Sequence, residues 1–340
     1  MRVKRAALVG AITAALVTAS FLLGRRLGTI NVGVGDFPEQ IVFVRSDDDV
    51  VNGGVLFTSP SKQSVKGIAV VWVHGWGANF YQPSYIGIGR ALAQRGLTNF
   101  GANTRMHDIA NVQQYRDGKR IRGGGYWGIP SEQVRDIAAW ISFAEKQGFT
   151  RVVLVGHSAG WAAVRAYQAD QKDPRVVGFV FASGQVQPPI GGPDKQLLDQ
   201  LEQATQFGKE GRGDDLIRIP NRSFASFISA ATLLDDFNTP LEVSDFFGVR
   251  VTNPAITKVT CPILAFFGTR SDVGTEADLK LITSAAERHS RRVHTTMIAG
   301  ADHMYTGEEA QVAEVISNWI DTAVIGKRST DTDATKPSGQ

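Results

Sequence analysis

Cysteine is almost absent from this chain of 340 residues, and neither sign of charge dominates it. The single cysteine, Cys261, excludes an internal disulfide framework, and its position just before an apolar run predicts a buried, inert thiol. Lys and Arg number 36 against 33 Asp and Glu, which leaves a formal net charge of +3. Because no dense basic run interleaved with aromatic residues is present either, we expect no nucleic-acid partner.

Two cofactor signatures are also missing. No G-x-G-x-x-G follows the first apolar strand, which argues against a dinucleotide-dependent dehydrogenase. No ligand spacing typical of a metal hydrolase occurs among the His, Asp and Glu residues, so we predict neither a metal nor a cofactor. The chain is 43% hydrophobic and 20% charged, which is ordinary globular usage and enough for one large α/β domain or two small ones.

The two ends of the chain differ in composition from the rest. Residues 1–28 hold a basic start, an uncharged and mostly apolar run at 6–23, and then Arg25 and Arg26. This order predicts either a cleaved signal peptide or a membrane anchor through residues 6–23, and in both cases an extracytoplasmic location, secreted or membrane-anchored. Residues 326–340 are almost entirely polar and predict a disordered, solvated tail.

Between these ends, short apolar runs alternate with segments of helical spacing. Continuous apolar runs are typical of parallel strands covered on both faces, and their alternation with helices predicts a doubly wound, mostly parallel α/β sheet. The first two runs, 40–44 and 54–57, predict a hairpin. Prolines and glycines punctuate residues 184–259, which we interpret as a helical cap insertion with helices at 196–207 and 224–234. The other predicted strands are 67–73, 98–103, 151–155, 175–182, 262–267 and 292–298, and the other helices are 84–95, 134–144, 162–171, 276–288 and 307–325, with Ser84 and Ser131 as N-caps.

One stretch, residues 151–161, predicts a strand, a sharp turn and a helix with Ser158 at the apex. Gly156 and Gly160 flank the serine where such a turn crowds the backbone, and a side chain at either place is expected to clash with the neighbouring strand or helix. The arrangement lifts a hydroxyl above the end of the sheet and places the next backbone N–H at a helix N-terminus. A tight structural turn without catalytic function is the alternative.

Ser158 is the candidate nucleophile, and it needs an adjacent base because a serine hydroxyl is nearly inert at neutral pH. His303 is the candidate base, in a short glycine-containing loop after the last predicted strand. In sheets with such an elbow the nucleophile, acid and histidine follow in that order along the chain, which favours His303 over its one real competitor, His107. Asp272 is the candidate acid, because it follows the preceding strand and can accept the imidazole Nδ1–H.

The acid has competing interpretations. Asp272 is alternatively an N-cap for the helix from Thr275 onward. Asp302 is disfavoured as the acid, because adjacent positions in a tight loop rarely let one side chain orient the other. The weaker acidic alternatives in the insertion are Asp235 and Asp236.

An oxyanion needs two preorganised N–H donors. One candidate is the backbone N–H of Ala159, directly after the nucleophile. The second is assigned to the N–H of Trp76, in the loop after the strand at 67–73, where Gly75 and Gly77 permit a close backbone approach. The N–H of Gly77 is the alternative donor. The other interpretation of this loop is a strand-ending turn with a packed histidine.

Four short motifs stand in the order and spacing of one known family: His74-Gly75-x-Gly77, Gly156-x-Ser158-x-Gly160, Gly268-x-x-x-Asp272 and Gly300-x-Asp302-His303. With them, the chain from about 38 to 325 resembles the α/β hydrolases. The resemblance implies a Ser158–His303–Asp272 triad and a helical cap at about 184–259. A weaker similarity relates the Asn-x-Arg-x-His-Asp loop at 103–108 to esterase-like proteins, some of which hydrolyse siderophore esters, a substrate that we do not extend to this chain.

These features predict a serine hydrolase that cleaves a small-molecule carboxylic ester through an acyl-enzyme. Amidase, thioesterase and acyltransferase activities use the same triad and stay open, as does a non-catalytic binding module with this fold. Arg105 either pairs with Asp108 or binds a substrate carboxylate. The aromatic residues considered for a substrate pocket, with ordinary core packing as the alternative, are Trp76, Tyr126, Trp127, Trp161, Phe224 and Phe227.

Overall fold

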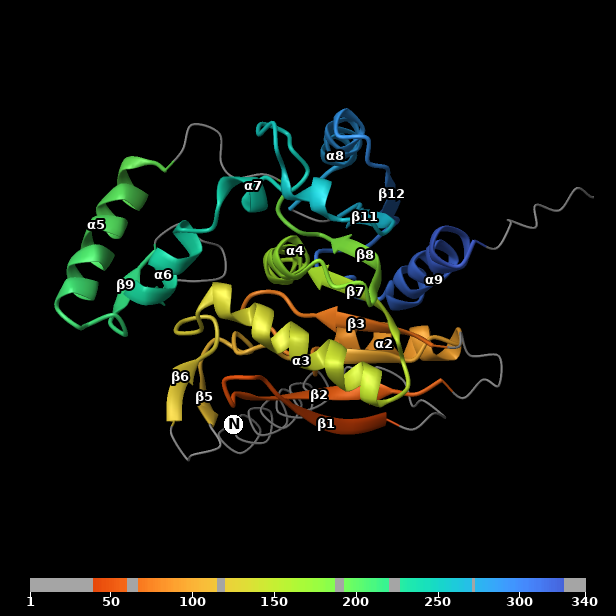
Figure 1. Ribbon diagram of the computed structural model, residues 1–340, viewed down its shortest axis with the longest axis horizontal. Helices are drawn as coiled ribbons and strands as arrows, with labels where there is room; N and C mark the ends of the chain where they lie inside the picture. The colour runs from red at the N-terminus through yellow and green to blue at the C-terminus, as the bar shows by residue number, and fades with distance from the viewer. Residues whose placement is uncertain are drawn as a thin grey trace, which may run out of the picture. The chain divides into compact units, whose positions relative to one another are not determined.

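The computed structural model describes residues 39–59, 67–114, 120–186, 193–219, 227–270 and 273–326. Its main feature is an eight-stranded sheet in the order β1-β2-β4-β3-β7-β8-β11-β12 (Figure 1). Only β2 runs antiparallel to its neighbours, so the predicted hairpin and the mostly parallel α/β sheet are confirmed. The strands are β1 (Glu39–Arg45), β2 (Val51–Phe57), β3 (Ile68–Val73), β4 (Asn99–Ala102), β7 (Arg151–His157), β8 (Val176–Ala182), β11 (Ile263–Gly268) and β12 (Val293–Ile298).

Helices cover both faces of the sheet, and the central strands are apolar for that reason. Every residue of β3 is buried, and its side chains alternate between the two core layers: Val71 and Val73 pack in one, Val70 and Trp72 in the other. The first layer is closed by α3 (Gln133–Lys146), α4 (Gly160–Gln171) and α8 (Glu276–Arg288), and the second by α2 (Pro83–Gln94) and α9 (Glu309–Trp319), which continues into the π-helical turn η3 (Ile320–Val324).

Two predicted N-caps are wrong. Helix α2 begins one residue before Ser84, with Pro83 in its first turn, because the fixed φ of proline suits that position. The N-cap of α3 is Glu132. Ser131 lies in the preceding 3-10 turn η1 (Pro130–Glu132), and its hydroxyl donates to a carboxylate of the insertion instead.

The stretch between β8 and β11 has a small core of its own, formed by Leu201, Ile217, Ile228 and Leu233 among others. The sequence predicts only helices here, but the structure adds a two-stranded ribbon. Its second strand occupies residues 227–229 of the predicted helix 224–234, and the helix itself begins only at residue 230. A second ribbon, also not predicted, lies in the glycine-rich loop after β4. The additional elements are α5 (Lys195–Lys209), β9 (Leu216–Arg218), β10 (Phe227–Ser229), α6 (Ala230–Phe237), α7 (Leu241–Ser244) and η2 (Ala255–Lys258), and β5 (Asn111–Gln114) with β6 (Arg120–Gly123).

Polar contacts join this insertion to the main sheet domain. The carbonyl of Tyr126 accepts from the N–H of Ser229 at 2.7 Å. The indole N–H of Trp127 donates to the carbonyl of Asp214 at 2.9 Å. Asp235 accepts from both the N–H and the hydroxyl of Ser131, at 2.7 Å each. The insertion is therefore held to the loop that precedes α3.

Both ends of the chain carry predictions that the structure does not test. The N-terminal segment 1–28 and residues 327–340 of the tail lie outside the described residues and stay predictions. Within the described ranges, no helix is both long and apolar enough to cross a membrane.

The Cys261 thiol is half-buried, and burial raises its pKa to about 12, as expected of an unreactive thiol.

Two adjacent glycines of β2 provide a test of the packing. A Cβ at Gly54 would lie 2.5 Å from the carbonyl oxygen of Gly101 and 2.4 Å from the Trp140 ring, whereas a Cβ at Gly53 meets nothing closer than the Phe43 ring at 3.3 Å. We expect Gly54→Ala to lower the free energy of unfolding by about 1–3 kcal/mol, measured by urea denaturation. Gly53→Ala is the matched control, and an equal loss in both variants would contradict this packing.

Candidate active site

Ser158 lies in the turn between β7 and α4, in a left-handed backbone conformation with φ of 53°. Both flanking glycines are required by close packing. A Cβ at Gly160 would lie 2.4 Å from the carbonyl oxygen of His74, at the end of β3, and a Cβ at Gly156 would lie 2.7 Å from the Cα of Trp161. The predicted crowding on both sides of the serine is therefore confirmed.

The Ser158 hydroxyl meets the imidazole of His303. The distance between Ser158 Oγ and His303 Nε2 is 3.0 Å, although the two residues are 145 positions apart. His303 lies in the loop between β12 and α9, and both side chains are half-buried. The structure thus brings together a serine hydroxyl and a base, the first requirement for nucleophilic chemistry.

The predicted acid, Asp272, lies outside the described residues. The chain just before it runs beside the histidine loop. The Thr269 hydroxyl accepts from the N–H of Gly300 at 2.8 Å, and the N–H of Arg270 donates to the carbonyl of Ala301 at 2.8 Å. The loop that leads to Asp272 is therefore tied to the loop that carries the histidine.

The acidic and histidine alternatives have partners of their own in the structure. The N-cap of α8 is Thr275, in a capping box with Asp278, so a helix cap at Asp272 is wrong. Asp302 accepts from the N–H groups of Met304 and Thr306, at 3.0 and 2.9 Å, and so holds its own loop. Asp235 binds the segment before α3, as described above. The competing histidine, His107, contacts its neighbour Asp108 at 2.8 Å.

The loop after β3 packs directly on the serine. A Cβ at Gly75 would lie 3.0 Å from the Cβ of Ser158. Within the part of the chain that the structure describes, the N–H groups of Trp76 and Ala159 donate to no other group. The Trp76 ring is fixed by its indole N–H, which donates to the carbonyl of Gly125 at 3.2 Å. Two backbone donors are thus available on the chain segments that meet at Ser158.

His74, at the start of this loop, is packed and neutral. It is fully buried, and burial lowers the pKa of its imidazole to about 4. Its Nδ1–H donates to the carbonyl of Gly75 at 2.7 Å, and its Nε2 accepts from the N–H of Thr104 at 3.1 Å. The packed histidine of the alternative interpretation is therefore present, and it supports the same loop that carries the Trp76 N–H.

Comparison with known proteins supports this fold assignment. Residues 70–315 match the model of the alpha/beta hydrolase family. The chain belongs to the α/β hydrolase family. A comparison with curated proteins finds no match.

Solved structures share the fold of this hydrolase at low sequence identity. Est1E from Butyrivibrio proteoclasticus is 13% identical with a TM-score of 0.55, over 84% of this chain and 99% of that one. A thermostable carboxyl esterase from Bacillus coagulans is 15% identical with a TM-score of 0.61, over 86% and 100%. The esterase domain of a Rhodothermus marinus protein is 17% identical with a TM-score of 0.51, over 84% and 99%.

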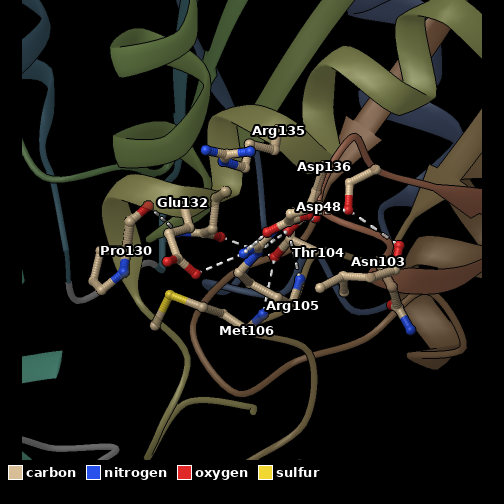
Figure 2. A network of polar contacts seen from close by, with 12 residues as sticks. Asp48, Asn103, Thr104, Arg105, Met106, Pro130, Glu132, Arg135 and Asp136 are labelled. Atoms are coloured by element: carbon tan, nitrogen blue, oxygen red, sulfur yellow. Dashed lines mark hydrogen bonds and ion pairs between the residues drawn. The ribbon is translucent and has the colours of Figure 1, made fainter. Parts of the chain in front are cut away.

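Arg105 takes neither of the roles predicted for it. Its guanidinium is 2% exposed and binds Asp136 at 3.0 Å, Asp48 at 2.8 Å and Glu132 at 2.6 Å, as Figure 2 shows. Asp108 instead accepts from Asn79 at 2.6 Å and from Tyr81 at 2.8 Å. The arginine of this hydrolase therefore ties the β1–β2 turn and the start of α3 to the loop after β4.

Four of the aromatic residues considered for a pocket form a row, and the other two do not belong to it. Trp161 is buried in the core among phenylalanines, whereas Phe224 lies outside the described residues. Trp76, Tyr126 and Trp127 are half-buried, and their neighbouring ring centroids are 6.2 and 5.7 Å apart. The exposed ring of Phe227 extends this row, 6.4 Å from Tyr126. The row leads from the loop that packs on Ser158 to the insertion.

The Arg105 cluster predicts a large effect on stability. Arg105→Met leaves the buried Asp136 carboxylate without its cation, and we expect a loss of about 3–5 kcal/mol in the free energy of unfolding. Arg105→Lys is expected to be damaging as well, because an ammonium cannot reproduce the forked contacts. The control is Arg135→Met, since Arg135 pairs with Asp47 at the surface, and it should change little. Equal losses in the two methionine variants, measured by urea denaturation, would show that the cluster is not stabilising.

Two buried histidines predict that stability depends on pH. Burial lowers the pKa of His74 to about 4 and of His157 to about 3, whereas both should titrate near 6.5 in the unfolded chain. Below pH 6.5 the unfolded chain therefore binds more protons than the folded chain, and stability is lost as the pH falls. We expect the free energy of unfolding to fall by up to about 1.4 kcal/mol per pH unit for each histidine as the pH is lowered from 6.5 to about 5. In urea titrations His157→Gln should remove about half of this slope; an unchanged slope would contradict the assignment.

Proposed function

We propose that this α/β hydrolase cleaves carboxylic esters through an acyl-enzyme formed on Ser158. The observation that carries the proposal is the 3.0 Å contact between Ser158 Oγ and His303 Nε2, at a serine held above the end of β7. In this role His303 takes the hydroxyl proton as the oxygen attacks the ester carbonyl, and then gives it to the leaving alcohol. Water activated by the same imidazole releases the acid.

The remaining parts of the machinery follow from the loops around the serine. Asp272 is the proposed acceptor for the Nδ1–H of His303, which would fix the imidazole tautomer and stabilise the imidazolium. The N–H groups of Trp76 and Ala159 are the proposed oxyanion donors, and each such donor is worth about 3–4 kcal/mol of barrier. Support comes from the tie between the chain before Asp272 and the histidine loop, and from the packing of Gly75 on the serine.

The ester class rests on the kind of proteins that share the fold. Two of the solved structures described above are named as esterases, and Est1E has also been solved with ferulic acid bound. Amide, thioester and acyl-transfer reactions use the same groups, so a panel of these substrates completes the test.

The proposal is tested by turnover of p-nitrophenyl butyrate with the full-length chain. We expect Ser158→Ala to lower kcat by at least about 10⁴-fold, and Asp272→Asn by about 10³- to 10⁴-fold, because the imidazole loses its orienting partner. Asp302→Asn is the matched control, one residue from His303, and should change kcat little.

Each outcome decides a separate assignment. If Ser158→Ala keeps the wild-type turnover, the assignment of Ser158 as the nucleophile is wrong. If Asp302→Asn lowers kcat severely and Asp272→Asn only mildly, the assignment of Asp272 as the acid is wrong. Faster turnover of a matched amide or thioester than of the ester overturns the substrate class.

A further inference from the structure

A chain of buried hydrogen bonds runs beneath Ser158 and joins the loops that meet there. The N–H of Gly75 donates to the Tyr85 hydroxyl at 3.2 Å. That hydroxyl contacts His157 Nδ1 at 2.6 Å, and His157 Nε2 contacts the backbone carbonyl of His303 at 2.9 Å. The chain therefore extends from the residue before Trp76 to the backbone of the histidine that touches the serine.

The partners of His157 fix its tautomer. A backbone carbonyl can only accept, so Nε2 carries the proton and donates to His303. Tyr85 already accepts from Gly75, and its own proton is directed to Nδ1. Burial, together with the nearby His303, lowers the pKa of His157 to about 3, so the ring is neutral at neutral pH. Every bond of the chain thus has one direction.

These side chains are closely packed. Tyr85 is 4% exposed and His157 is fully buried. The His157 ring lies between aromatic neighbours, with centroid distances of 4.9 Å to His303, 5.3 Å to Tyr305 and 5.4 Å to Tyr85. Because water does not reach the hydroxyl or the imidazole, the loss of either partner leaves the other without a replacement.

We propose that Tyr85 and His157 are positioning residues, which hold the loop of Trp76 and the loop of His303 in register with Ser158. This inference rests on the proposed function. Neither side chain touches a reacting atom; each end of the hydrogen-bond chain fixes the backbone of a segment that supplies a reacting or stabilising group. The neutral His157 ring also adds no positive charge beside the imidazolium that His303 forms during the reaction.

Tyr85→Phe tests the proposal directly, because it removes the hydroxyl and keeps the ring. With p-nitrophenyl butyrate and the full-length chain, we expect kcat to fall about 10- to 100-fold while KM stays within about threefold, since misplaced groups slow the reaction more than they weaken binding. Labelling of Ser158 by a fluorophosphonate should slow in parallel.

The matched control is Tyr167→Phe. Tyr167 is also buried, and its hydroxyl donates to Asp173 at 2.6 Å, a contact that involves neither the turn of Ser158 nor the loops of Trp76 and His303. Both variants lose one buried tyrosine hydroxyl, so both should unfold at lower urea concentration. Only Tyr85→Phe should lower kcat. An equal effect of the two variants on kcat would mean that the Tyr85 hydroxyl contributes only to overall stability.

His157 provides a second, graded test. His157→Gln keeps an amide donor that can reach the His303 carbonyl, whereas His157→Leu keeps none. We expect the glutamine variant to retain most of the labelling rate and the leucine variant to lose as much as Tyr85→Phe. If the glutamine variant is as impaired as the leucine variant, the donor to His303 is not what matters. Tyr85→Phe decides the proposal if the leucine variant does not fold.

Labelling by the fluorophosphonate separates the positioning role of Tyr85 from the nucleophile role of Ser158. A folded wild-type chain that no fluorophosphonate labels at Ser158 overturns the nucleophile itself. A wild-type chain that is labelled, together with a Tyr85→Phe variant labelled at the same rate, overturns only the positioning role.

Discussion

The left-handed backbone of Ser158 is the constraint on which the rest of the site depends. This conformation costs a non-glycine residue on the order of 1–3 kcal/mol, and it persists only where the surrounding structure enforces it. Here the N–H of Ser158 donates to the carbonyl of Ala182 at the end of β8, and its carbonyl accepts from Trp161 in α4. Glycines on both sides let β3 and α4 approach closely enough to hold the turn. The hydroxyl is therefore placed by the sheet and by helix α4 together.

Burial assigns different tasks to the three histidines around this serine. His74 and His157 are fully buried, and burial depresses the pKa of both imidazoles, to about 4 and about 3. A proton from the serine would therefore be costly to place on either ring at neutral pH. His303 is half-buried at the carboxyl end of the sheet and is the one in contact with the hydroxyl. His74 and His157 thus make hydrogen bonds to backbone groups, whereas His303 is the histidine that would accept the serine proton in the proposed reaction.

The features that the sequence predicts correctly have short-range signals. A continuous apolar run is enough to place β3, and a serine between closely spaced glycines after a β-branched strand is enough to place the elbow. The loop of His303 follows from strand order. The ribbons β5–β6 and β9–β10 are missed because strands of three or four residues leave little periodicity to detect.

The missed contacts depend on residues far apart in the chain. Arg105 meets Asp48 across 57 positions, and Tyr85 meets His157 across 72. Tyr85 falls in the apolar stripe of α2, where an aromatic residue is ordinarily core, so its hydroxyl carries no local signal. Ser131 resembles a helix cap in sequence, but a partner from the insertion takes its hydroxyl. Local patterns predict elements, whereas the pairing of polar groups is decided when distant elements pack.

Mass spectrometry of the quenched protein is the most direct test of whether Ser158 forms the covalent intermediate. The full-length chain is mixed with p-nitrophenyl butyrate, quenched in acid, and its peptides are mapped. We expect one butyryl group on the peptide that contains Ser158, and none on the corresponding peptide of Ser158→Ala. A butyryl group on another residue of the wild type, or undiminished ester turnover by Ser158→Ala, would contradict this role of Ser158.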